Sequence, residues 1–218
     1  MNKSTLPLLD SSLYPQVWQQ QTFLNPQIFL MALLTTDMTL DAGLFTKQLL
    51  ANNTYQDWIN ATVFGRYLHR NFTAFYQQTE DSFNEEMPAL FRQELIRHAQ
   101  YLPLEQTLFF AGDLPKSVRQ TKLLTTTVNP MTVLIDGQKL KEQEAKHHSR
   151  VIVNQIKITG KQVLGFPIRH NKRTSERLRN EVLILGFQDL RLVNEQEVEA
   201  LGRSNAASTT LLRSYELR

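Results

Sequence analysis

Cysteine is absent from this chain of 218 residues. This absence excludes a disulfide framework, a thiolate nucleophile and a cysteine-based metal site. Long apolar runs are also missing, because the best candidate, "IFLMALL", is far shorter than the roughly 20 residues that a membrane helix needs. The first residues, "MNKSTLPLLDSS", lack the apolar stretch of a cleavable secretory signal. We therefore expect a soluble protein without a membrane span.

Several chemical motifs are missing as well. The segment "ITGKQ" has a single glycine and lacks the spacing of a phosphate-binding loop. No serine lies in a nucleophile elbow. The pair His147 and His148 has no further ligands at metal spacing, so a solvated loop explains it better than a metal site, and no metal is expected.

Charge is unevenly distributed along the chain. The net charge is only +3, but residues 1–100 carry 6 Lys and Arg against 9 Asp and Glu, whereas residues 101–218 carry 18 against 12. The basic excess lies between Lys139 and Arg179. Such a patch can bind nucleic acid, the phosphates of a dinucleotide or an acidic protein face, or it can be a solvated surface without a partner.

The expected secondary structure changes near residue 100. Residues 1–100 have apolar residues at helical spacing, with a helix start at Asn25-Pro26 and a stop at Asn52-Asn53. Residues 101–218 contain short β-rich runs separated by Gly, Asn, Lys and Pro. Residues 137–150 are expected as a helix or a long loop, and the tail after Asn194 as a short polar helix or a ragged end. This order predicts an α+β fold in one compact unit, with a helical lead-in (1–100) and a β-rich core (101–218).

Three segments of the second half follow one another in an informative order. "LPLEQTLFFAGD" is an apolar strand that ends in Ala-Gly. "LLTTTVNPMTV" is a strand with three hydroxyls followed by Asn-Pro, which suits the start of a helix. "RTSERLRNEVLILGFQDLRLV" is a basic loop, a glutamate and two strands joined by a turn. Taken singly, each is more often an ordinary strand or a charge at the end of a strand than part of a site.

Together these segments resemble the catalytic core of mono-ADP-ribosyltransferases of the arginine-serine-glutamate type, many of which are bacterial toxins or effectors. "TTTVNP" is similar to their Ser-Thr-Ser segment, and "NEVLILGFQDLRLV" to their final glutamate strand. The resemblance covers roughly residues 104–193. It implies a helical N-terminal part packed on two small sheets that form an NAD cleft. It also implies transfer of ADP-ribose from NAD to a macromolecule, with a protein as the expected acceptor. The enzyme itself is expected to be cytoplasmic or to be secreted into a target cell without a cleavable signal.

The resemblance assigns roles to individual residues. A carboxylate beside the ribose stabilises the positive charge that develops as nicotinamide departs, and Glu181 takes this place. Thr125 orients that glutamate and holds the site together. The arginines before Glu181 are expected to recognise the acceptor: Arg173, Arg177 and Arg179. NAD is expected to contact Thr125, Thr126, Thr127, Ala111, Gly112, Arg119 and Phe166.

The chain departs from the family pattern at two places. Ala111 stands where the family has an arginine at the end of a strand, and a different base, such as Arg119, Arg150 or Arg169, could replace it, although the sequence does not single out one of them. Arg179 stands where the family has an acid that helps to activate an arginine acceptor, which makes arginine a less expected target. Two alternatives therefore stay open. One is a noncatalytic module of this fold that binds nucleic acid or an acidic protein through the basic patch, and the other is an enzyme with a nucleic-acid acceptor.

Overall fold

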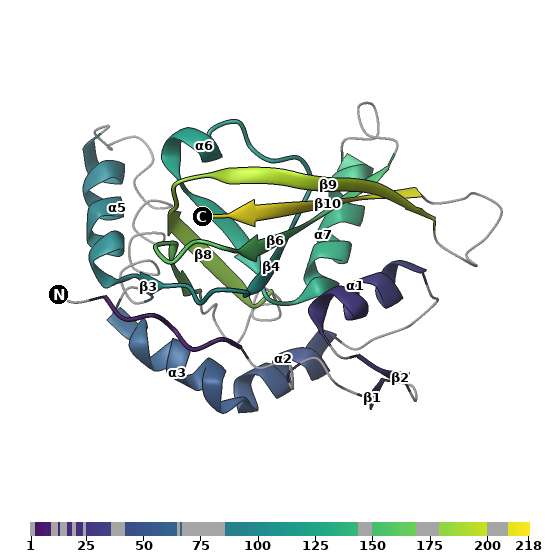
Figure 1. Ribbon diagram of the computed structural model, residues 1–218, viewed down its shortest axis with the longest axis horizontal. Coiled ribbons are helices and arrows are strands. Elements are labelled where there is room, and N and C mark those ends of the chain that lie inside the picture. The colour runs from purple at the N-terminus through teal and green to yellow at the C-terminus, as the bar shows by residue number, and fades with distance from the viewer. Residues whose placement is uncertain are drawn as a thin grey trace.

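The structure, a computed structural model, describes residues 3–9, 13, 17–18, 21–23, 25–35, 42–64, 66, 86–143, 150–168, 179–199 and 209–218. After a short pair of strands, helices make up most of the described chain before residue 100, and strands dominate after it (Figure 1). The fold is therefore a mixed one of helices and sheet, as the sequence predicts. Among the described residues, no helix is long and apolar enough to cross a membrane.

The helical first part contains α1 (Pro26–Thr35), α2 (Ala42–Ala51), α3 (Asn53–Ala61) and α5 (Glu86–His98). Asparagine side chains cap the N-terminal ends of two of these helices. The Asn25 Oδ1 accepts a hydrogen bond of 2.8 Å from the backbone N–H of Ile28, and the Asn52 Oδ1 accepts one of 2.9 Å from Tyr55. Such bonds satisfy N–H groups that have no partner inside the helix. The predicted helix start at Asn25-Pro26 is confirmed, and the predicted stop after α2 is also the cap of α3.

The strands form an eight-stranded sheet in the order β3-β7-β8-β5-β4-β6-β10-β9. A separate two-stranded hairpin, β1 (Val17–Trp18) and β2 (Gln21–Thr22), lies outside it. The strands of the large sheet are β3 (Gln100–Tyr101), β4 (Thr107–Ala111), β5 (Leu124–Thr127), β6 (Val151–Ile158), β7 (Leu164–Pro167), β8 (Glu181–Gly186), β9 (Leu190–Glu199) and β10 (Thr209–Leu217).

This sheet has a narrow junction in its middle. The ladder between β4 and β5 consists of one register pair, Phe109 with Thr127, whereas β4 and β6 share a five-residue register from Thr107 to Ala111. We call the four strands β3-β7-β8-β5 the glutamate half, because β8 begins with Glu181, and the four strands β4-β6-β10-β9 the long-strand half. The two separate sheets expected from the sequence are thus joined as one hydrogen-bonded sheet.

The end of the chain differs most from the expectation. The tail after Asn194 was expected to be a short helix or ragged, but β9 continues to Glu199 and β10 follows. β10 lies between β6, to which it is parallel, and β9, to which it is antiparallel. A strand inside a sheet buries consecutive residues on both faces, as Leu211 and Leu212 do here, so the polar and apolar alternation that reveals an exposed strand is lost.

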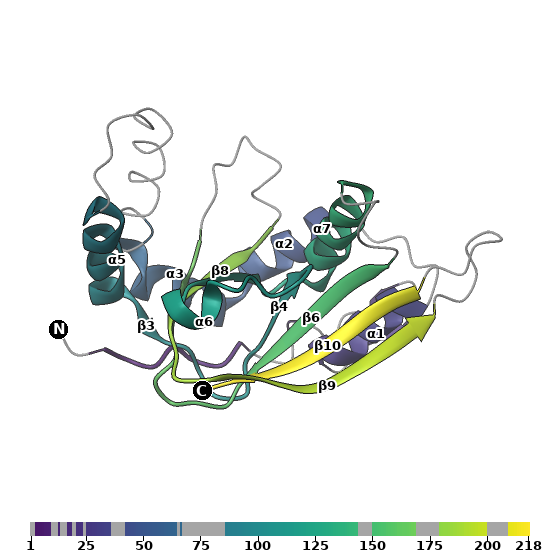
Figure 2. The ribbon, with the colours of Figure 1, turned by 90° about the horizontal axis from the view of Figure 1, so that it is seen from above.

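The core places the helices against different parts of the sheet. One buried cluster joins Phe29, Phe45 and Trp58 of the first helices to strand residues such as Leu108. A second cluster packs Leu95 of α5 against Leu183 of β8. In the view from above, α5 and α7 (Pro130–Gln143) are well separated from each other on one side of the molecule, and β9 and β10 lie along the other side (Figure 2).

Helix α7 begins at the Asn-Pro pair that the sequence predicts as a helix start. The Asn129 Oδ1 accepts a hydrogen bond of 3.0 Å from the backbone N–H of Met131. Further along, Gly137 lets the helix lie close to β6, because a Cβ at this position would be 2.8 Å from the Val151 Cγ1. The approach of α7 to the sheet therefore depends on the absence of a side chain at Gly137.

Candidate functional site

A cleft of about 620 Å³ opens where the two halves of the sheet separate. The end of β4, strand β5, helix α6 (Val118–Thr121), helix α7 and the residues around Glu181 form its walls. This volume lies within the range of small-molecule sites, about 300–1,000 Å³. Its charged lining residues, within the described part of the chain, are Asp113, Asp136, Lys139, Arg179 and Glu181.

Glu181 is the first residue of β8 and lines this cleft. The residue is 8% exposed, and Thr127 of β5 is its register partner across the strands. The Arg179 Nε donates a hydrogen bond of 2.7 Å to the Glu181 Oε1. The carboxylate thus lies in the cleft wall next to the threonine triplet, held by an arginine two residues earlier.

Arg179 joins Glu181 to a second carboxylate on helix α7. Its terminal nitrogens lie 3.0 Å and 2.8 Å from the two carboxylate oxygens of Asp136. Burial lowers the pKa of the Arg179 guanidinium. The hydrogen bonds and charges of Glu181 and Asp136 raise the same pKa by more, so it lies above its ordinary value. Arg179 is therefore a fixed cation between two acids from different elements.

The three threonines of β5 differ in what their hydroxyls contact. Thr125 is exposed and lines the cleft. Thr126 is buried, and its Oγ1 donates a hydrogen bond of 2.7 Å to the carbonyl of Val182. Thr127 is also buried and lies against the turn before β8, where its Oγ1 donates to the carbonyl of Arg179 at 2.5 Å. Thr126 and Thr127 thus hold β8 in place, and Thr125 presents its side chain to the cleft.

A buried polar network fixes the residue before Glu181. Asn180 has φ +47°, in the left-handed region that asparagine tolerates better than most residues. Its Oδ1 accepts hydrogen bonds of 3.0 Å from the Thr46 Oγ1 and 3.3 Å from the Asn129 Nδ2. This network ties the start of β8 to α2 and to the first turn of α7, and so fixes where the Glu181 side chain leaves the backbone.

The Ala-Gly end of β4 lies at the rim of the cleft. Ala111 lines the cleft, and Gly112 has φ +79°, a conformation that favours glycine. The Gly112 carbonyl accepts a hydrogen bond of 2.7 Å from the buried Asn154 Nδ2. Gly112 lines a neighbouring hollow of about 190 Å³ with Arg150. Its visible role is to turn the chain at the end of β4.

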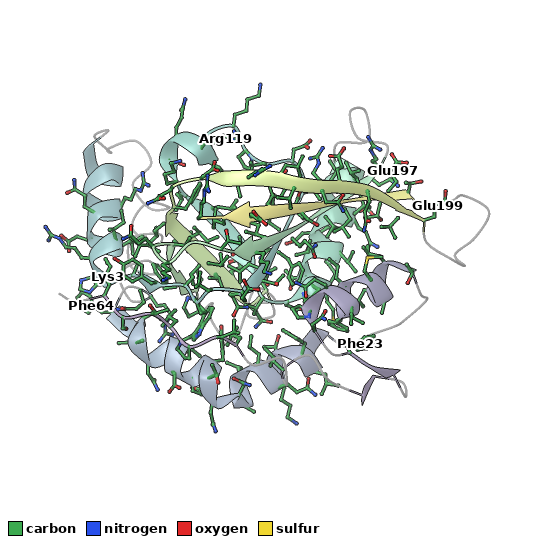
Figure 3. All side chains as sticks on the ribbon, viewed as in Figure 1. Lys3, Phe23, Phe64, Arg119, Glu197 and Glu199 are labelled. Atoms are coloured by element: carbon green, nitrogen blue, oxygen red, sulfur yellow. The ribbon has the colours of Figure 1, made fainter. Side chains whose placement is uncertain are left out.

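Other predicted residues are not brought together with Glu181. Arg119 is exposed on α6 and is not among the residues that line the cleft (Figure 3). Phe166 is completely buried, in the cluster between α5 and β8. Arg150 forms an ion pair with Glu197, which Figure 3 places on β9. The remaining predicted positions lie outside the described residues: His147, His148, Arg169, Arg173 and Arg177.

Two residues of this site were missed from the sequence. Asp136 and Thr132 lie one turn apart on α7 and both line the cleft. A helical signal was available, since the Asn-Pro start places residues 132 and 136 on one helix face. Asn180 gave no comparable signal, because its role depends on contacts with α2 and α7. Within the described ranges, no group of three metal-ligating side chains is found.

Comparison with known proteins finds no match by sequence and finds similarity to several solved structures at low identity. No family model matches the sequence, and no curated protein matches it. Among solved structures, the chain is similar to the enzymatic component C2-I of the C2-toxin from Clostridium botulinum, with 11% identity over 75% of this chain and a TM-score of 0.41. The chain spans only 45% of that C2-I chain.

Two further structures are similar over most of their length. The C3larvin toxin, an ADP-ribosyltransferase from Paenibacillus larvae, is 10% identical, with 84% of this chain and 89% of that chain covered and a TM-score of 0.36. The ADP-ribosyltransferase Vis, solved in complex with agmatine, is 15% identical, with 87% and 85% covered and a TM-score of 0.38. These names agree with the family that the motif order resembles. The identities and TM-scores are low, so the proposed function rests on the geometry of the cleft.

Proposed function

We propose that this chain transfers ADP-ribose from NAD to a protein acceptor at the cleft that Glu181 lines. The observation that carries the proposal is the position of the Glu181 carboxylate, which lines the cleft beside Thr127 and is held by Arg179 at 2.7 Å. A carboxylate fixed at the beginning of a strand is preorganised to stabilise positive charge on a bound ribose.

The reaction follows from this arrangement. The bond between the ribose C1′ and the nicotinamide nitrogen breaks, and its electron pair neutralises the pyridinium ring as nicotinamide departs. The ribose passes through an oxocarbenium-like transition state, whose charge the Glu181 carboxylate opposes while it accepts a hydrogen bond from the 2′-OH. A nucleophilic atom of the acceptor then forms a bond to C1′ and loses its proton to solvent.

Other residues around the cleft support this chemistry. Thr125 is exposed and lines the cleft, so its hydroxyl is available to the ribose or to the nicotinamide amide. Thr126 and Thr127 act indirectly, through the hydrogen bonds that fix β8. Ala111 and Gly112 shape the rim at the end of β4. Acceptor recognition by Arg173 and Arg177 stays a prediction.

The test is the release of nicotinamide from NAD, together with labelling of proteins in a cell lysate by labelled NAD. Glu181→Gln keeps the shape of the side chain and removes its charge, so we expect the rate to fall by about 10²–10³. Glu216→Gln is the matched control, because Glu216 is an exposed glutamate on β10 that does not line the cleft. Thr125→Val is expected to reduce the rate less than Glu181→Gln. Equal rates for Glu181→Gln and the unaltered protein would refute the assigned role.

One observation favours a second candidate, a noncatalytic module that binds an acidic partner. Arg179 forms an ion pair with Glu181, and Ala111 leaves the end of β4 without a cation. A protein with no NAD turnover that binds polyanions through the basic region from Lys139 to Arg179 would fit these facts. Binding through several phosphates weakens steeply with salt, whereas NAD turnover without an acceptor depends on salt much less. Measuring both at two salt concentrations separates the candidates.

A further inference from the structure

The cleft has few cations for the pyrophosphate of a dinucleotide. The end of β4, where the resembled family has an arginine, carries Ala111. Among the described residues that line the cleft, only Lys139 and Arg179 are cations. Arg119 does not line the cleft, and Arg150 forms an ion pair with Glu197 and lines the neighbouring hollow. Among the described candidates this leaves the two cations of the cleft, while Arg169 lies outside the described residues.

Arg179 is placed to bind a third anion besides its two carboxylate partners. A guanidinium has five N–H donors in a planar fork. The contacts with Glu181 and Asp136 engage Nε and one N–H on each terminal nitrogen. Each terminal nitrogen has two N–H groups, so one donor on each remains beyond these contacts. The side chain is 38% exposed, so a ligand in the cleft can reach it.

The covalent structure of NAD places a phosphate close to such a donor. The 2′-OH that Glu181 is proposed to bind and the 5′-phosphate belong to the same ribose. A residue that binds this phosphate therefore lies within the length of one ribose 5′-phosphate from the 2′-OH that Glu181 is proposed to bind. Arg179 touches Glu181 through Nε, and its terminal nitrogens extend beyond this contact toward α7.

We infer that Arg179 binds the pyrophosphate of NAD in place of the missing arginine at the end of β4. This inference rests on the proposed function, because it assumes that the dinucleotide binds in this cleft. Asp136 is a positioning residue, since its two carboxylate oxygens hold the terminal nitrogens of Arg179 from the α7 side. Arg179, which the sequence assigned to the acceptor, is here a ligand of the donor substrate.

The decisive measurement is the binding of two ligands by the full chain, followed by calorimetry. ADP-ribose carries the pyrophosphate and lacks nicotinamide, whereas nicotinamide riboside carries nicotinamide and lacks phosphate. Arg179→Gln is expected to weaken ADP-ribose binding by about tenfold to a hundredfold, the range of a lost charge-assisted hydrogen bond. Nicotinamide riboside binding should weaken by a clearly smaller factor, because this ligand loses only the support that Arg179 gives to Glu181 and no phosphate contact. Arg179→Lys keeps the charge without the fork and is expected to lie between the two.

Arg119→Gln is the matched control, because it removes an exposed arginine outside the cleft and should leave both affinities unchanged. Unfolding curves of each variant separate a folding defect from lost contacts. An unaltered ADP-ribose affinity in Arg179→Gln, an equal loss for both ligands, or a larger loss in Lys139→Gln would each overturn the assignment. If the unaltered protein binds ADP-ribose but releases no nicotinamide from NAD, the transferase proposal fails while the role of Arg179 stands. Failure to bind ADP-ribose at all refutes both.

Discussion

The two halves of the sheet contribute differently to the cleft. The glutamate half presents polar groups that are fixed by buried hydrogen bonds, with Thr127 against the carbonyl of Arg179 and Asn180 bonded by Thr46. The long-strand half presents mainly an apolar wall at the end of β4, including Phe109 and Ala111. Chemistry and packing are thus divided between the halves, and they meet at the single pair of Phe109 with Thr127.

This division predicts that the largest effect on stability comes from the junction. Phe109 is completely buried, in a cluster with residues of β6, β10, α1 and α7. Phe109→Ala should lower the free energy of unfolding by about 3–5 kcal/mol, because the lost ring leaves a cavity. Denaturant unfolding measures this change, and Phe109→Leu serves as a milder control. A loss below about 1 kcal/mol would mean that the junction does not depend on this ring.

A smaller effect is expected from the polar network of the glutamate half. Asn180→Ala removes the acceptor of Thr46, and alanine tolerates the left-handed conformation at φ +47° less well than asparagine does, so the free energy of unfolding should fall by about 2–3 kcal/mol. Asn180→Gly removes the same amide, but glycine adopts a positive φ without steric strain. The free energy of unfolding should therefore fall by about half as much as in Asn180→Ala. Chemical denaturation compares the two. If both variants lose the same amount, the backbone conformation contributes nothing to the cost.

The smallest effect is a pH dependence in the long-strand half. Burial, first of all, raises the pKa of Tyr215 above its ordinary value of 10.0. Because the folded protein holds this proton more tightly than the unfolded chain, the contribution to stability is fully present below pH 10 and is lost as the pH rises through the raised pKa.

Tyr215→Phe removes this contribution. Between pH 9 and about pH 12, a range that brackets the ordinary pKa of tyrosine, the free energy of unfolding of this variant should therefore fall less steeply than that of the unaltered protein. Denaturant unfolding at several pH values measures the two slopes. Parallel slopes would show that the buried hydroxyl does not titrate differently in the folded state.

Much of the fold is visible in local sequence signals. The helical start at Asn25-Pro26, the helix after Asn129-Pro130 and the strand that begins at Glu181 are all found where the sequence predicts them. Each depends on residues within a few positions, such as a capping asparagine or an apolar run. Local signals of this kind survive in most folded contexts.

The rest depends on pairings that a single sequence does not encode locally. β10 was missed because its place between β6 and β9 depends on pairing with distant parts of the chain, and because its first half buries consecutive residues instead of alternating ones. The link from Arg179 to Asp136 was missed because 43 residues separate them, and only the packing of α7 against β4, β5 and β6 brings Asp136 to the turn before β8. For the same reason Arg179 was assigned to acceptor recognition, although its carboxylate partners lie in the cleft wall.

Gly137 determines how far the wall of the cleft can shift. It adjoins Asp136, and any side chain at this position would meet Val151. A single added methyl group would strain the contact between α7 and β6 directly beside Asp136, the residue that holds the Arg179 guanidinium. Gly137 also lines the neighbouring hollow at the end of β4, so its hydrogen atom keeps the helix close to the sheet and leaves that hollow open.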